Sequence, residues 1–297
     1  MERKIRQISI YRTNLAVAEH EEDINGETLM NTVITDEDGN ETERISYDNE
    51  GNPEERVIIN YQNGKPVEER LEMAGELAER TTREFDATGR PVKEFRHYLE
   101  GDPDEILYEY DQEGHLIKRQ LTDSDGEEGE KHLWIYENKL LMREESYNEY
   151  GDLESSKTYT YSENGNIEEV VEVTHSDGEQ TRLVTIYNEA GKIDTDKRYD
   201  SRGRLTARNI YTYDESGNND TIEEETVSGK TSITLHHDEA GNNILHEETD
   251  ADGTLITRIE RSYNPEGRPE TTEVRMENTS RRMGQHYRLR YEYQYFG

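Results

Sequence analysis

Turn glycines recur along this chain in two interleaved series, each with a period of about 25 residues. A fixed period of this length is the signature of repetitive architectures, so it constrains the fold more than any other feature. The first series is Gly39, Gly64, Gly89, Gly114, a gap filled by Asn138-Lys139, then Gly165, Gly191, Gly217, Gly241 and Gly267. The second is Gly26, Gly51, Gly75, Gly101, Gly126, Gly151, Gly178, Gly203, Gly229 and Gly253. Together they predict a turn every 12 or 13 residues.

Aromatic residues keep the same period as the glycines. Seven of the 20 tyrosines, together with one phenylalanine and one histidine, form a ladder with steps of 24 to 26 residues. The ladder comprises Tyr61, Phe85, Tyr110, Tyr136, Tyr161, Tyr187, Tyr213, His237 and Tyr263. A register held over eight steps establishes the repeat.

The turns share the motif aromatic, then Asp, Asn or Ser, then two variable residues and glycine. Copies include YDNEGNP (47–53), YNEAGKI (187–193) and YNPEGRP (263–269). Asp or Asn at the first turn position accepts hydrogen bonds from backbone amides ahead of it. Glycine adopts a positive φ without steric cost. The motif therefore predicts a type I turn closed by a glycine bulge, a common hairpin connection.

The segments between turns have the composition of β-strands. Stretches such as TRLVTIY (181–187) and SITLHH (232–237) are rich in β-branched residues. Residues 71–80, LEMAGELAER, have the composition of a helix, but they follow the repeat with Gly75 at the turn, so strands are expected there too.

The predicted fold is all-β: a repetitive antiparallel β-hairpin meander of about 20 strands, coiled into a ribbon, spiral or open shell because strands twist relative to their neighbours. A β-solenoid is the alternative, since the same glycine spacing could mark its corners. The expected organisation is an N-terminal cap at 1–25, about ten two-strand repeats at 26–274, and a C-terminal capping or docking strand at 275–297.

The composition limits the partners of the chain. The 297 residues include 69 Asp and Glu against 35 Lys and Arg, a net charge of −34. Such a surface repels nucleic acid and anionic membranes and attracts basic proteins. With no cysteine, no disulfide is expected. No apolar stretch suits a signal peptide or a membrane span, so we expect a cytoplasmic protein. A secreted or cell-surface protein whose leader was removed would look the same.

No pattern of residues indicates catalysis, a cofactor or a metal. The nine histidines do not have the spacing of a known metal-ligand motif. The three that lie closest together in the sequence are His236, His237 and His246. Three D-x-D-G turns, beginning at Asp36, Asp123 and Asp250, lack the further oxygen ligands that calcium needs. With no nucleophile or nucleotide-binding motif, we expect a protein that is not an enzyme and has no cofactor.

Two places depart from the repeat and are candidates for partner binding. The C-terminal segment carries Arg281 and Arg282 and ends with an aromatic run containing Tyr291, Tyr293 and Tyr295. It predicts either a capping strand with paired arginines or an exposed edge onto which another chain docks. Trp134 lies where a turn glycine is replaced, and tryptophan is enriched in binding hot spots.

The turn units YDQEGHL (110–116), YDSRGRL (199–205) and YDESGNN (213–219) strongly resemble the YD repeats of bacterial Rhs proteins and their teneurin relatives. The segment YQNGKPVEE (61–69) also resembles the repeats of the YwqK family of antitoxins. The Rhs resemblance implies a spiralling β-shell around a toxin domain. This chain differs in having a short array, no Rhs core boundary motif and no appended toxin domain, so it looks more like a partner, immunity or adaptor component.

These observations predict a non-enzymatic protein-binding repeat protein. The first hypothesis is an immunity or antitoxin-like protein that sequesters a basic toxin or effector. An adaptor or chaperone for a secreted effector, and a cell-surface structural or carbohydrate-binding protein, are the alternatives. The oligomeric state is not specified by the sequence.

Overall fold

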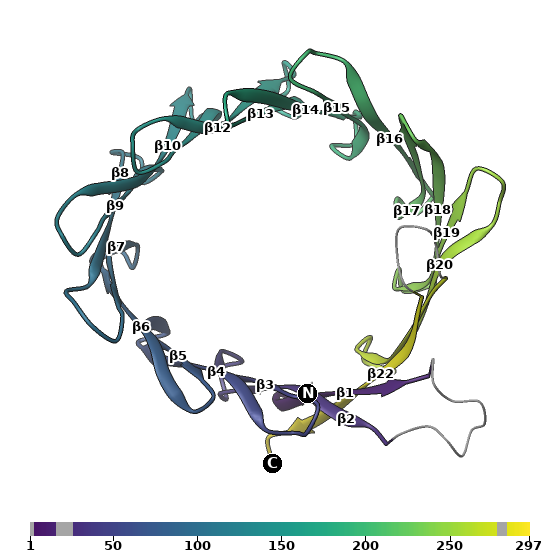
Figure 1. Cartoon of the computed structure of the whole chain (residues 1–297), viewed down its shortest axis with the longest axis horizontal. Coiled ribbons are helices and arrows are strands. Elements are labelled where there is room, and N and C mark those ends of the chain that lie inside the picture. The colour runs from purple at the N-terminus through teal and green to yellow at the C-terminus, as the bar shows by residue number, and fades with distance from the viewer. Residues whose placement is uncertain (1–2, 16–25, 278–283) are drawn as a thin grey trace. The chain divides into compact units, whose positions relative to one another are not determined.

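The computed structural model describes residues 3–15, 26–277 and 284–297. All regular elements in these ranges are β-strands, 22 in total (Figure 1). None of the described residues forms a helix of the length and apolarity needed to cross a membrane.

The chain divides into two compact units. Unit 1 comprises Met1–Arg80, Tyr213–Thr221 and Thr231–Gly297, and unit 2 comprises Thr81–Thr212 and Ile222–Lys230. The strands of unit 1 are β1 (Ile5–Asn14), β2 (Thr28–Thr35), β3 (Glu41–Tyr47), β4 (Pro53–Gln62), β5 (Lys65–Met73), β19 (Asn243–Asp250), β20 (Leu255–Tyr263), β21 (Pro269–Met276) and β22 (Gln285–Tyr295).

The strands of unit 2 follow one another without interruption. They are β7 (Pro91–His97), β8 (Asp104–Tyr110), β9 (Leu116–Thr122), β10 (Glu128–Glu137), β11 (Leu140–Tyr147), β12 (Leu153–Tyr161), β13 (Ile167–Ser176), β14 (Glu179–Tyr187) and β15 (Ile193–Tyr199). The boundaries between units fall inside β6 (Glu76–Phe85), β16 (Leu205–Tyr213), β17 (Asn219–Thr226) and β18 (Gly229–His237).

The first and last strands pair with each other, which corrects the predicted architecture. All 22 strands belong to one sheet, and β1 pairs antiparallel with β22 from Ile5–Tyr295 to Asn14–Tyr287 (Figure 1). Because β1 also pairs with β2 and β22 with β21, neither terminal strand has a free edge. The sheet is therefore closed, and the predictions of an open ribbon, spiral or shell and of a β-solenoid are wrong. Closure satisfies the edge amides and carbonyls that an open sheet would expose.

The aspartate and asparagine turns have the predicted geometry. At residues 188–192 the Gly191 amide donates to the Asn188 carbonyl at 2.9 Å, and the Asn188 amide donates to the Lys192 carbonyl at 2.8 Å. Gly191 has a φ of 74°, and the strand register shifts beside it. The Asn188 side chain accepts from the amides of Ala190 and Lys192, both at 3.0 Å. The type I turn with a glycine bulge is confirmed.

Replacing Asn188 by alanine is expected to lower the free energy of unfolding by about 1 kcal/mol, because two turn amides lose their acceptor. Asn188→Asp keeps that acceptor and is expected to match the wild type, since aspartate has the same role at Asp48. Urea denaturation of the two variants measures the difference. Equal stability of the alanine and aspartate variants would show that the side-chain bonds contribute nothing.

A second turn type interrupts the motif in four places. Asn63-Gly64, Ala74-Gly75, Asn138-Lys139 and Asp177-Gly178 all have positive φ at both residues. This is the two-residue type I′ hairpin turn, whose twist matches that of the flanking strands. It explains how Asn138-Lys139 replaces a turn glycine, and it confirms the strands predicted for residues 71–80 as β5 and β6.

The buried core is thin and largely polar. Among the described residues, the hydrophobic side chains that are buried are Ile106, Val184 and Val274. Most other buried side chains are small and hydroxylated: Ser9, Thr32, Thr81, Ser156, Thr195, Thr257 and Thr272. The sheet therefore depends on its hydrogen-bond ladder and on the side chains that cover it.

Four ladder tyrosines, and Tyr293 on the last strand, each connect their strand to the start of the preceding one. The Tyr161 hydroxyl donates to the Leu141 carbonyl at 2.7 Å, and Tyr110 donates to the Pro91 carbonyl at 2.7 Å. Tyr61, Tyr263 and Tyr293 make the same bond to Glu41, Asn243 and Pro269. Burial raises the pKa of Tyr161, as expected for a hydroxyl held against the sheet.

The variant Tyr161→Phe is expected to destabilise the fold by about 1 kcal/mol, because the Leu141 carbonyl loses a donor while the ring packing remains. Thr160→Ala, one residue earlier and on the exposed opposite face, is the control. Thermal melts of both variants test this. A Tyr161→Phe melt identical to that of the wild type would contradict the role of the hydroxyl.

Candidate functional site

The predicted partner-binding residues lie in different parts of the chain. Arg281 and Arg282 lie outside the described residues. Tyr291, Tyr293 and Tyr295 lie on β22 in unit 1, whereas Trp134 lies on β10 in unit 2. Partner binding at these positions stays a prediction, and their surroundings show what each can do.

The three C-terminal tyrosines pack across the seam between β22 and β1. Tyr291 lies opposite Ile10 and Tyr293 opposite Ile8 on one face of the sheet. Tyr295 accepts a hydrogen bond from Arg268 at 3.0 Å. Burial raises the pKa of Tyr293. Since β22 is paired on both sides, a second chain could add to its edge only by displacing β1 or β21.

The described arginines of β22 are engaged with neighbouring carboxylates. Arg288 lies 2.7 Å from Glu273 on β21. Arg290 bonds Glu27 at 2.8 Å and Glu292 at 3.2 Å, and the bond to Glu27 raises its pKa. This is the arrangement expected of a capping strand whose arginines pair with acidic neighbours.

Trp134 lies in a cross-strand row of charged residues. It stands directly opposite Glu144 on β11, which is opposite Lys157 on β12, which is opposite Glu172 on β13. The indole stacks on His132, with ring centroids 5.9 Å apart. Directly opposed residues share a face of an antiparallel sheet, so the half-buried Trp134 ring, the two carboxylates and Lys157 lie on one face.

Tyr159 extends the same face by one row. The Tyr159 hydroxyl donates a hydrogen bond to Glu144. Burial raises the pKa of this hydroxyl most, and the hydrogen bond to the Glu144 carboxylate raises it further. We call this surface, composed of Trp134, Glu144, Lys157, Tyr159 and Glu172, the Trp134 face.

The chain around the Trp134 face is strongly acidic. Residues 144–181 contain eleven Asp and Glu, and Lys157 is their only Lys or Arg. Lys157 lies 3.5 Å from Glu172, so it neutralises only part of this charge. This face offers cationic side chains two kinds of interaction: ion pairs with the carboxylates and cation–π contacts with the aromatic rings.

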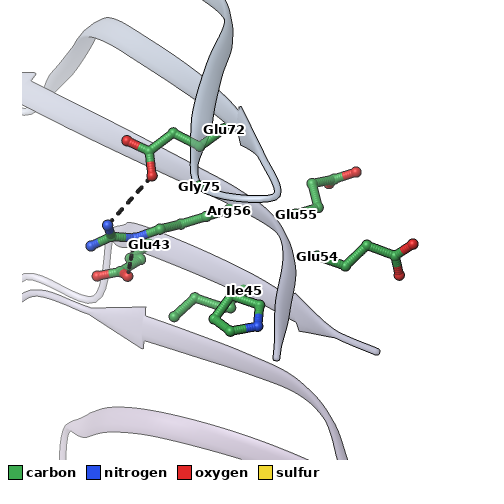
Figure 2. A pocket seen from close by; sticks show the side chains of 8 residues that line it. Glu43, Ile45, Glu54, Glu55, Arg56, Glu72 and Gly75 are labelled. Carbon is green, nitrogen blue, oxygen red and sulfur yellow. Dashed lines mark hydrogen bonds and ion pairs between the residues drawn. The ribbon is translucent and has the colours of Figure 1, made fainter. Parts of the chain in front are cut away.

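A shallow pocket between β3, β4 and the β5–β6 turn is occupied by an internal ion pair. Figure 2 shows Arg56 between Glu43 and Glu72, at 2.7 and 3.5 Å. The bond to Glu43 raises the pKa of Arg56. Glu54 and Glu55 point away from this pair in Figure 2. The arrangement connects three neighbouring strands, β3, β4 and β5.

In the described part of the chain, no group of three or more His, Asp and Glu side chains could hold a metal ion. The D-x-D-G aspartates are used by their own turns: Asp36, Asp123 and Asp250 each accept two backbone amides. Among the three histidines singled out in the sequence, burial lowers the pKa of His246.

Sequence reasoning identified Trp134 but missed Glu144, Tyr159 and Glu172. The register of the Asn138-Lys139 hairpin places Trp134 opposite Glu144, after a bulge beside Tyr136. The position of this hairpin in the sequence could therefore have identified Glu144 as the cross-strand neighbour of Trp134.

No family model matches the chain, and no curated protein does so either. Similar solved structures include a chain of TcdB2-TccC3 (TM-score 0.32, 12% identity, 84% of this chain and 19% of that one). A chain of the Photorhabdus luminescens Tc holotoxin pore gives a TM-score of 0.31 at 12% identity, over 84% of this chain and 18% of that one. A porin-like protein from Bacteroides uniformis gives 0.34 at 9% identity, over 98% of both chains. This chain thus spans about a fifth of the Tc toxin chains that it matches, and at these TM-scores the similarities support no inference about its function.

Proposed function

We propose that this chain is a non-enzymatic protein-binding repeat protein that sequesters a basic partner, in an immunity or antitoxin-like role against a basic toxin or effector. The observation that carries the proposal is the Trp134 face, where Trp134 and Tyr159 lie among the carboxylates of Glu144 and Glu172. The motif resemblance to YD and YwqK-type repeats supplies the biological context.

The charge of the chain supports the same partner chemistry. A net charge of −34 steers a basic protein toward the surface and accelerates its association. Aromatic rings then add contact area with little loss of side-chain freedom, which is why Trp and Tyr dominate hot spots. Nucleic acids and anionic membranes are repelled by the same field.

A salt-dependent pull-down with matched variants tests the proposal. The tagged chain is incubated with lysate of its own cells, and captured proteins are identified by mass spectrometry. We expect a basic protein that is retained at about 50 mM salt and released near 500 mM, where charges are screened within about 4 Å. Expressed alone, that protein should inhibit growth, and co-expression of this chain should restore growth.

The variants assign the binding to one face. Glu144→Gln/Glu172→Gln removes two charges from the Trp134 face and is expected to weaken binding about tenfold. Glu145→Gln/Glu169→Gln removes the same charge from the opposite face of the same strands and is expected to bind like the wild type. Equal binding by both variants would reject the Trp134 face, and a captured protein that is acidic or harmless would reject the immunity role.

A further inference from the structure

The start of β1 and the end of β22 lie between two turns at one margin of unit 1. One turn, residues 36–40, joins β2 to β3, and the other, residues 264–268, joins β20 to β21. Because β1 pairs with β2 and with β22, and β22 pairs with β21, the β22–β1 pair separates these two turns.

A pocket that is open to solvent lies between these two turns. Its walls come from the segment before β1, the start of β1, the end of β2 and both flanking turns. The lining includes Arg3, Lys4, Ile5, Ile8, Asp38 and Arg268. We call it the seam pocket.

Two of the three cationic side chains of the seam pocket, Lys4 and Arg268, are held in place by the fold. The Phe296 amide donates to the Lys4 carbonyl at 3.1 Å, and the Lys4 ammonium donates to the Glu37 carbonyl. Arg268 donates to the Tyr295 hydroxyl at 3.0 Å and lies 5.5 Å from the centre of that ring. These contacts place the cations before any ligand arrives, which lowers the ordering cost of binding.

The charge of the seam pocket is opposite to that of the chain. Arg3, Lys4 and Arg268 face a single lining carboxylate, Asp38, in a chain with a net charge of −34. The neighbouring Asp36 is engaged by the backbone and side-chain amides of Asn40. Asp36 and Glu37, in the same turn as Asp38, do not line the pocket, so a bound anion would contact three cations and one carboxylate.

Part of the pocket lining is apolar, because it includes Ile5 and Ile8. We propose that the seam pocket binds a small organic anion in which a carboxylate or phosphate is joined to an apolar group. The anionic group pairs with Lys4 and Arg268, and the apolar group covers the isoleucines. This inference is independent of the partner proposed for the Trp134 face.

Titration with four probes tests the ligand chemistry. Phenyl phosphate and benzoate carry both features, inorganic phosphate lacks the ring, and phenol lacks the charge. By calorimetry or NMR, we expect at least one of the two organic anions to bind with a Kd of about 0.1–1 mM, and phosphate and phenol to bind about tenfold more weakly. The ratio between phenyl phosphate and benzoate identifies the preferred anionic group. Absence of binding by both organic anions at about 10 mM would overturn the proposal.

Variants show whether the cations hold the anion. Lys4→Gln and Arg268→Gln are each expected to weaken phenyl phosphate or benzoate binding about tenfold. Arg204→Gln is the matched control, because Arg204 follows its turn glycine as Arg268 does but pairs with Asp200 in unit 2. Lys4 is exposed, so its variant remains informative if Arg268→Gln fails to fold. Unchanged affinity in Lys4→Gln and in folded Arg268→Gln would overturn the proposal.

Discussion

The double variant Ile10→Cys/Tyr291→Cys is expected to form an intramolecular disulfide and to become more stable when oxidised, by up to about 5 kcal/mol. The two residues lie directly opposite each other on β1 and β22. The bond would close a loop of about 280 residues, and the loss of chain entropy from the unfolded state grows with loop length. The natural sequence has no cysteine, so no other intramolecular disulfide can form.

The geometry of this pair suits a disulfide. The Leu15 amide donates to the His286 carbonyl at 2.8 Å, which makes residues 15 and 286 a hydrogen-bonded pair. Hydrogen-bonded and non-hydrogen-bonded pairs alternate along antiparallel strands, so Ile10 and Tyr291 form a non-hydrogen-bonded pair. Such pairs have Cα atoms about 4.5 Å apart, within the range that disulfides span.

Gel mobility without reductant and urea denaturation in both redox states measure the effect. Comparing one variant oxidised and reduced cancels the cost of losing the isoleucine and tyrosine side chains. Ser9→Cys/Tyr291→Cys is the control, because Ser9 points to the opposite face and is expected to give no intramolecular bond. If the Ile10/Tyr291 variant oxidises only between molecules, the first and last strands do not pair in solution.

Local features of the fold were predictable from sequence, whereas closure was not. An Asp or Asn followed three residues later by Gly determines its own hydrogen bonds, as Asn188 and Gly191 show. Pairing of β1 with β22 joins segments at opposite ends of the sequence, and no local pattern encodes it. Strand twist alone was compatible with an open coil and with a closed sheet.

The candidate site was predictable only in part, because its neighbours depend on register. Trp134 stands out by residue type, but Lys157 and Glu172 become its neighbours only through two further hairpins with their own bulges. The C-terminal tyrosines were expected either on a capping strand or at an exposed edge onto which another chain docks, and in the structure β1 covers that edge. An edge cannot be recognised from one strand, since it is defined by the absence of a partner.

Ile106 is the most completely buried large side chain among the described residues, and its surroundings explain why it matters in so thin a sheet. It has no exposed surface, and it lies on β8 between Glu94 of β7 and Leu121 of β9. Leu121 in turn covers Gly129, where an added Cβ would lie 2.5 Å from the leucine side chain. Glu94 is bonded by Arg83 at 3.0 Å and Arg96 at 3.1 Å, so it cannot move into a vacated space without breaking ion pairs.

Ile106→Ala is therefore expected to lower the free energy of unfolding by about 3 kcal/mol, because the cavity has no neighbour free to fill it. Ile106→Val should cost about 1 kcal/mol. Leu107→Ala is the matched control: Leu107 is the next residue, on the opposite face and 38% exposed, so its truncation should cost clearly less than that of Ile106. Urea denaturation followed by the fluorescence of Trp134, the only tryptophan and in the same unit, measures all three. Equal losses for Ile106→Ala and Leu107→Ala would mean that this sheet has no local core and that its stability is spread evenly over the strand ladder.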